Sequence, residues 1–237
     1  MINCAEKEVT VIDRTGSAKS VVEIIKLSES PMSAVGIEAF TEGSAEALPE
    51  KPLKIEFIGD SITCGYGVDD EDENHQFTTA TEDVTKAYAY KTAKALDAEY
   101  SMFSASGYGI VSGYTEGDEP ISEQTIPQFY CSYGFSRGNF AGTAPQDIPW
   151  DFSKYIPQII VINLGTNDDS YCRDHKDRQA VFSKLYADFL AVVREKNPQA
   201  YILCTVGIMG ERIFPAVEEG IKTVSYTHLT LPTNSRV

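Results

Sequence analysis

Ser61, Gly107 and Asn167 each follow a short apolar run that predicts a β-strand. A serine acts as a nucleophile when a base takes its proton and fixed N–H donors face the oxyanion that develops. Three groups are candidate donors: the backbone N–H of Ser61 at a predicted helix start, the unobstructed backbone N–H of Gly107, and the side-chain amide of Asn167. The residues therefore indicate acyl transfer from an ester, with Ser61 as the attacking group.

These three residues can meet only if their strands lie side by side and point the same way. Strands are predicted at residues 53–58, 100–104, 159–164 and 201–206, and helices at residues 84–96 and 179–196. The near-continuous apolar character of the third strand indicates burial on both faces, as in parallel sheets. The alternation of strands and helices predicts an α/β fold with a doubly wound parallel sheet. Ligands of such sheets bind beyond the carboxyl ends of the strands, where all three residues are expected.

Both predicted helices carry an apolar face. Residues 84–96 place Ala89, Ala93 and Leu96 on one side, and we expect that side to be buried. Residues 179–196 place six apolar side chains at helical spacing: Phe182, Leu185, Tyr186, Phe189, Val192 and Val193. These faces are expected to cover the sheet.

Residues 1–48 differ in pattern from the rest of the chain. Short β-branched runs at residues 9–11, 21–25 and 35–40, separated by turn-forming residues, predict three antiparallel strands. Because three strands make a thin sheet with open edges, residues 1–48 are expected to be the last strands of an incomplete, jelly-roll-like β-sandwich. A proline-containing linker then leads to the domain that begins at residue 53.

The segment between residues 107 and 150 is irregular and rich in Gly and Pro. So long a loop in a compact domain is usually functional, and we interpret it as the wall of a substrate pocket. Trp150 is a candidate substrate contact, because aromatic rings stack on sugars. Its neighbours Pro149 and Phe152 favour a second interpretation, in which Trp150 packs in the core before the third strand.

The charge of the chain limits its partners. The 237 residues include 35 Asp and Glu against 20 Lys and Arg, for a net charge of −15. A field of that sign repels phosphate backbones and anionic lipid, so nucleic acid is a poor partner. No segment approaches the roughly 18 consecutive apolar residues of a membrane-spanning helix. Residues 1–6 lack the basic-then-apolar pattern of a signal peptide, and a soluble protein is expected.

The sequence offers no obvious metal site. Its five cysteines are scattered and lack C-x-x-C spacing, so they are expected to be free thiols: Cys4, Cys64, Cys131, Cys172 and Cys204. The acidic run at residues 69–73 lacks the alternating ligand spacing and mid-loop glycine of a calcium loop, and a solvated acidic loop is expected. We therefore expect no metal and no organic cofactor.

Three ordered blocks resemble the signature of a known family. Gly-Asp-Ser-Ile-Thr at residues 59–63, the glycine at 107 and Gly-Thr-Asn-Asp at residues 165–168 look like the first three blocks of the SGNH (GDSL-type) hydrolases. The resemblance implies a flavodoxin-like hydrolase fold with Ser61 as the catalytic nucleophile. It also implies that Ser61, Gly107 and Asn167 form the oxyanion hole.

A narrower resemblance points to carbohydrate esterase family two. It is carried by residues 55–67, 150–152 and 161–168 and extends over roughly residues 20–210. Members of that family remove acetyl groups from xylan and related sugars, carry an N-terminal β-sandwich and can be secreted. The resemblance implies a serine esterase that removes O-acetyl groups from carbohydrate, or from another small acyl ester, through an acyl-enzyme.

The fourth block of the family has no counterpart in this sequence. Family members place an Asp-x-x-His-type segment after a fifth strand, and its histidine is the general base. We interpret His75 and His175 as solvated surface residues, and His228 as part of a non-native tail at residues 225–237 that matches no family segment. Residues 53–224 are expected to be a hydrolase domain that lacks its last strand and its catalytic histidine, with an open sheet edge and reduced stability.

Two alternatives stand beside the esterase. In the first, the chain is a carbohydrate-binding remnant of such an esterase, whose pocket holds a sugar without acyl transfer because the base is missing. The second, a flavodoxin-like binder of phosphate or nucleotide, is disfavoured because no glycine-rich phosphate loop follows the first strand and the net charge is negative.

Overall fold

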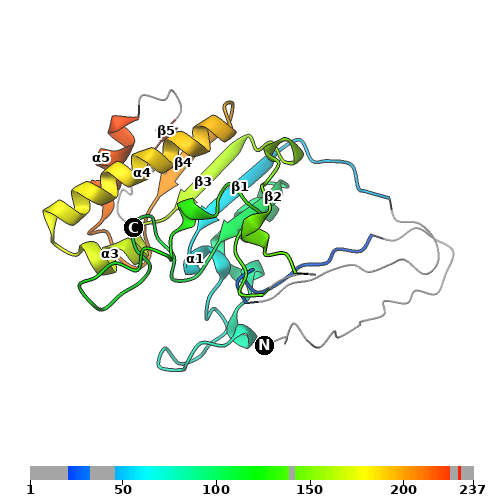
Figure 1. Cartoon of the computed structure of the whole chain (residues 1–237). Helices are drawn as coiled ribbons and strands as arrows, with labels where there is room; N and C mark the ends of the chain where they lie inside the picture. The colour runs from blue at the N-terminus through cyan, green and yellow to red at the C-terminus, as the bar shows by residue number, and fades with distance from the viewer. Residues whose placement is uncertain (1–20, 33–45, 139–141, 225–228, 231–237) are drawn as a thin grey trace.

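The computed structural model describes residues 21–32, 46–138, 142–224 and 229–230, which form an α/β sheet structure (Figure 1). The strands are β1 (Lys54–Gly59), β2 (Glu99–Ser104), β3 (Ile159–Asn163), β4 (Tyr201–Thr205) and β5 (Leu229–Thr230). The helices are α1 (Ser61–Cys64), α2 (Tyr88–Ala95), α3 (Thr166–Cys172), α4 (Lys176–Lys196) and α5 (Phe214–Thr223).

All neighbouring strands of the sheet are parallel, in the order β2-β1-β3-β4-β5. This is the flavodoxin-like order, so the predicted doubly wound parallel sheet is confirmed. The chain moves outward from β1 to β2 and then returns to the other side of β1 with β3. The winding therefore reverses between β1 and β3, which is where such sheets bind their ligands.

The ends of the central strands are level with one another. Gly59 at the end of β1 lies opposite Ser104 of β2 and Asn163 of β3. Asn163 in turn lies opposite Thr205 of β4. Residues that follow these four positions therefore start from the same edge of the sheet.

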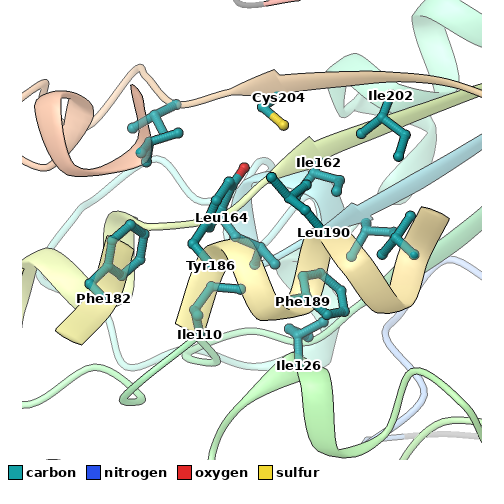
Figure 2. Packing of buried hydrophobic residues seen from close by; sticks show 14 of the residues in the cluster. Ile110, Ile126, Ile162, Leu164, Phe182, Tyr186, Phe189, Leu190, Ile202 and Cys204 are labelled. Atoms are coloured by element: carbon teal, nitrogen blue, oxygen red, sulfur yellow. The ribbon is translucent and has the colours of Figure 1, made fainter. Parts of the chain in front are cut away.

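One face of the sheet packs against α4 and α5. Side chains at alternate strand positions, among them Ile58, Ile160, Ile162 and Ile202, belong to the same buried cluster as residues of these two helices. Figure 2 shows Phe182, Tyr186, Phe189 and Leu190 of α4 against the side chains of β3 and β4. Each fully buried side chain of this size contributes roughly 1.5 to 3 kcal/mol to folding.

The opposite face packs against α2. Phe57 of β1 and Val161 of β3 share a buried cluster with Ala89 and Ala93, which are two of the three residues that we predicted on the apolar side of this helix. The third, Leu96, is 53% exposed, so that part of the prediction is wrong. The segment begins as a 3-10 turn, Val84–Lys86, and α2 ends at Ala95, which leaves the following leucine outside the helix.

The segment that precedes β1 differs from its prediction. Residues 21–25, which were expected to form a strand, make no strand pairing. The expected strands at residues 9–11 and 35–40 lie outside the described residues, so the β-sandwich is not confirmed. Residues 27–29 instead contact the α/β sheet structure, for example through the hydrogen bond from Val84 N to the Leu27 carbonyl at 3.1 Å.

The far edge of the sheet also differs from its prediction. Leu229 and Thr230, inside the tail that was expected to be non-native, pair in parallel with Ile202 and Leu203 of β4. The expectation that nothing covers β4 is therefore wrong in part. The two-residue strand still leaves much of the five-residue β4 edge without a partner among the described residues.

Two further predictions concern thiols and membrane spans. The cysteines that the structure describes are free thiols, as predicted, and Cys4 lies outside the described residues: Cys64, Cys131, Cys172 and Cys204. Of the helices in the described ranges, none is both long enough and apolar enough to cross a bilayer.

Candidate active site

Ser61 is the first residue of α1 and directly follows the turn that ends β1. The Asp60 side chain caps this helix, since its Oδ1 accepts a hydrogen bond from Ile62 N at 3.0 Å. A Cβ on Gly59 would lie 2.0 Å from Thr63 Oγ1, so glycine is required for the helix to fold back onto the strand end. Strand, glycine and cap together place the partly buried Ser61 at the carboxyl edge of the sheet.

Gly107 lies in the turn that follows β2. Its φ of 82° is in the left-handed region that favours glycine. A Cβ at this position would meet only Gln124 Oε1, at 4.0 Å, so the space beside the residue is open. The Gly107 carbonyl accepts a hydrogen bond from Tyr114 N at 2.8 Å, whereas its N–H donates to no acceptor among the described residues. The turn is thus fixed while the candidate donor stays free.

Asn167 follows β3, and its side chain contacts the segments that follow β1 and β2. Its Nδ2 donates a 2.8 Å hydrogen bond to the Tyr108 carbonyl and makes a longer contact, 3.4 Å, with Asp60 Oδ2. The amide therefore contacts the residue after Gly107 and the residue before Ser61. Asn167 is 6% exposed, which holds the amide in a largely desolvated environment.

Asp168 is a site residue whose role the motif did not reveal. The carboxylate is fully buried and accepts hydrogen bonds from the backbone N–H groups of Ile110, Val111 and Ser112, at 2.9, 2.6 and 3.1 Å. It thereby anchors the loop that follows Gly107. Gly-Thr-Asn-Asp contains this residue, but its spacing gives no sign of the contacts with residues 110–112.

The two buried aspartates of the site have raised pKa values. Burial raises the pKa of Asp60 to about 7; the hydrogen bond from Ile62 N opposes this rise and the negative charge of Asp168 adds to it. Burial also raises the pKa of Asp168 to about 6, against the lowering effect of its backbone donors. Neither side chain carries a described contact to Ser61 Oγ, so neither is assigned to proton transfer.

The described histidines lie on the surface, as predicted. His75 is bonded to the acidic loop through its Nδ1 and Asp70 Oδ1, at 2.8 Å, and its side chain is 64% exposed. His175 is exposed at the start of α4. His228 lies outside the described residues. Among the residues that the structure describes, none hydrogen-bonds the Ser61 hydroxyl.

Trp150 is half-buried and packs on Tyr133 in an edge-to-face arrangement, with 5.1 Å between the ring centroids. It belongs to neither buried cluster, so the preferred interpretation of Trp150 as a core residue is not supported. Its role as a substrate contact stays a prediction. The loop between residues 107 and 150 does line a small cavity of about 90 Å³ near β2, with Tyr108, Phe129 and Phe135 in its wall.

One cluster of metal-binding residue types occurs in the described ranges. Ligand atoms of Glu29, Cys64 and Glu82, all buried, lie within 4.8 Å of one another. Lys26 lies close to them: burial lowers the pKa of its amine, and the negative charge of Glu82 is the largest effect that opposes this shift. Because a lysine already brings a cationic group to the cluster, we interpret it as a buried polar network that holds no metal.

Comparison with known proteins agrees with the motif. Residues 57–226 match the GDSL-like Lipase/Acylhydrolase family. The chain is 34% identical over 211 residues to "Cellulase/esterase CelE" of Acetivibrio thermocellus, an alignment that covers 88% of this chain and 24% of that protein. It is 31% identical over 212 residues to an "Acetylxylan esterase / glucomannan deacetylase" of Cellvibrio japonicus, covering 87% of this chain and 54% of the relative. The chain thus spans about half or less of the length of these relatives.

Solved structures of carbohydrate esterases are also similar to this chain. A family two carbohydrate esterase from Clostridium thermocellum, in complex with cellohexaose, superposes with a TM-score of 0.63 at 32% identity, over 79% of this chain and 55% of that chain. The acetyl xylan esterase Est2A from Butyrivibrio proteoclasticus gives a TM-score of 0.69 at 25% identity, over 78% and 56%. The fold, the ordered motif blocks and the match over most of the chain lead to one conclusion: this protein belongs to the GDSL-like lipase/acylhydrolase family.

Proposed function

We propose that this chain is a serine esterase domain that removes O-acetyl groups from carbohydrate, with Ser61 as its nucleophile. The observation that carries the proposal is the position of Asn167, whose amide contacts the flanks of both Ser61 and Gly107. Relatives named as acetylxylan esterases support the acetyl ester and the carbohydrate as substrate.

In the proposed reaction, Ser61 Oγ attacks the carbonyl carbon of the acetyl ester. The carbonyl oxygen becomes an oxyanion held by the N–H groups of Ser61 and Gly107 and by Asn167 Nδ2. The C–O bond to the sugar then breaks, the sugar leaves as an alcohol, and water hydrolyses the acetyl-enzyme to acetate. We assign the proton transfers to no described residue, because the described histidines are exposed.

The Asn167 side-chain amide can donate a hydrogen bond to the oxyanion. One N–H of its amide is held by the short bond to the Tyr108 carbonyl, which fixes the orientation of the group. The other makes only the long 3.4 Å contact with Asp60, so it is the N–H that would donate to an oxyanion. A preorganised donor of this kind contributes roughly 2.7 to 4 kcal/mol to transition-state stabilisation.

The decisive experiment compares the wild-type chain with Ser61→Ala on 4-nitrophenyl acetate and on acetylated xylan. We expect acetate release from both substrates in the wild type and none above background in the variant. Ser153→Ala is a matched control, since this exposed serine precedes β3 and lies on the opposite edge of the sheet. Equal rates in the wild type and Ser61→Ala would contradict the proposal.

A second function is favoured by one observation: no described residue is placed to accept the Ser61 proton. Under this alternative the chain binds carbohydrate without cleaving the ester. Affinity electrophoresis in acetylated xylan separates the two functions. Retarded migration without any Ser61-dependent release of acetate would favour the binding protein.

A further inference from the structure

A buried acidic residue far from the motif blocks contacts the Gly107 turn directly. Glu29, in the segment that precedes β1, is 7% exposed. Its Oε2 accepts a hydrogen bond of 2.6 Å from Ser106 N. Ser106 immediately precedes Gly107, so the bonded N–H and the candidate oxyanion donor belong to consecutive peptide units.

The Glu29 carboxylate also reaches the helix that carries Ser61. Cys64, the last residue of α1, places its Sγ 3.8 Å from the same Oε2 atom. One carboxylate oxygen therefore contacts both elements of the candidate site, the turn after β2 and the helix after β1. At 2.6 Å the bond to Ser106 N is short, so the turn is held by the position of this oxygen.

Glu29 is itself held in place by its backbone. Its N–H donates to Glu82 Oε2 at 3.2 Å, and its carbonyl accepts from Met32 N at 3.1 Å. Close by, the Leu27 carbonyl accepts from Val84 N at 3.1 Å. The segment around Glu29 is therefore tied to the loop before α2 and cannot shift without breaking these bonds.

We propose that Glu29 is a positioning residue for the esterase reaction, which holds the Ser106–Gly107 turn so that the Gly107 N–H faces the acyl oxygen. The inference rests on the proposed function, since it assigns Glu29 a part in the same site. It also makes the segment before β1 part of the site, although that segment lies outside the predicted hydrolase domain. Glu29 touches no reacting atom and acts through Ser106.

Two substitutions separate the effect of the length of the Glu29 side chain from the effect of its charge. Glu29→Gln keeps the length of the side chain and an acceptor oxygen but removes the charge, whereas Glu29→Asp keeps the charge and is one methylene shorter. We expect kcat to stay within about 3-fold of wild type in Glu29→Gln and to fall about 10- to 100-fold in Glu29→Asp, with KM unchanged in both. Glu23→Gln, at an exposed position of the same segment, is the matched control and should leave kcat and KM unchanged.

The opposite order, with Glu29→Gln much slower than Glu29→Asp, would overturn the proposal in favour of a role for the charge. Equal kcat values in wild type and Glu29→Asp would also overturn it. Thermal melting of each variant, with rates expressed per folded molecule, removes any contribution from lost stability.

Amide hydrogen exchange tests the same contact without any turnover. In Glu29→Asp, the Ser106 N–H should exchange at least about 10-fold faster than in wild type and in Glu29→Gln, while buried amides of α4 keep their rates. An unchanged Ser106 rate in Glu29→Asp would overturn the proposal. A wild type without Ser61-dependent activity would refute the proposed function alone, because the exchange rates still show whether Glu29 holds the turn.

Discussion

The strand ends of β1, β2 and β3 differ sharply from the end of β4. At the first three ends, the buried Asn167 amide hydrogen-bonds both Asp60 and the Tyr108 carbonyl. After β4, Ile208 and Met209 are 85% and 71% exposed. Ile208 also has a φ of 73°, in a region that β-branched residues rarely adopt. The first region is held rigidly by buried hydrogen bonds, and the second is apolar and faces solvent.

The contrast locates the part of the molecule in which the geometry of the candidate site is fixed. In the reaction that we propose, negative charge develops on an acyl oxygen beside these buried hydrogen bonds, and preorganised donors are effective there because they need not reorganise during the reaction. Among the described residues, 207–209 after β4 make no hydrogen bond that would hold such donors in place. Substitutions in the first region should therefore act on kcat, whereas those after β4 should leave kcat unchanged.

The largest expected effect is on turnover at Asn167. Asn167→Ala should lower Ser61-dependent kcat about 100- to 1000-fold, because it removes one oxyanion donor. Asn167→Asp should lower kcat further, since a carboxylate of nearly the same shape would repel the oxyanion. Met209→Ala is the counterpart after β4 and should leave kcat at the wild-type value. Steady-state kinetics on 4-nitrophenyl acetate measure all three, and a loss of less than 10-fold in Asn167→Ala would contradict the comparison.

The next effect is on the pH dependence of stability. Burial in β1 raises the pKa of Glu56 from its ordinary value of 4.5 to about 7, against the lowering effect of the hydrogen bond from Tyr130. Between these values the folded state holds a proton that the unfolded state has released. The free energy of unfolding should therefore fall as the pH rises from about 4.5 to about 7.

Glu56→Gln removes this titration and keeps an acceptor for the Tyr130 hydroxyl. We expect the variant to be more stable than wild type at pH 8, by a free energy on the order of 3 kcal/mol, and closer to wild type at pH 5. Urea denaturation at the two pH values measures this difference. The raised pKa values of Asp60 and Asp168 act in the same direction, so some pH dependence should persist in the variant. Wild-type stability that increases from pH 5 to pH 7 would refute this account.

The smallest expected effect is a difference in kcat between alanine substitutions at two glycines with similar backbone conformations. Gly107 and Gly67 have φ values of 82° and 63°, and a Cβ on either would have room. Alanine at each position should cost about 1 to 2 kcal/mol of stability, because both glycines adopt the left-handed conformation. Only Gly107→Ala should also lower kcat, about 10-fold, since it alters the turn that carries the donor. Equal kcat values per folded molecule in the two variants would remove Gly107 from the oxyanion hole.

Local patterns in the sequence predicted the sheet well. The apolar runs of β1, β3 and β4 and the alanine face of α2 depend on neighbouring residues, so they can be recognised in a short window. The doubly wound parallel sheet followed from the alternation of strands and helices and from the handedness of parallel crossovers, whereas the order of its strands was not predicted. Leu96 was misplaced because α2 ends one residue earlier, and such end points are set by tertiary contacts.

The candidate site was predictable only where it coincides with a motif. Ser61 and Asn167 follow strands directly, and the parallel sheet brings such positions to one edge. The contact between Glu29 and Ser106 joins residues that are 77 positions apart and leaves no local pattern. The three hydrogen bonds that Asp168 accepts from the loop at residues 110–112 have the same character. These contacts depend on how separate segments pack, which spacing along the chain does not encode.

The most direct test of the central claim is a crystal structure of the chain after reaction with a 4-nitrophenyl alkylphosphonate. Such a reagent leaves a stable tetrahedral ester on an activated serine. We predict that phosphorus is bonded to Ser61 Oγ, with one phosphoryl oxygen about 2.7 to 3.1 Å from both the Gly107 nitrogen and Asn167 Nδ2. A label on another residue, or an oxygen that points away from both donors, would contradict the account.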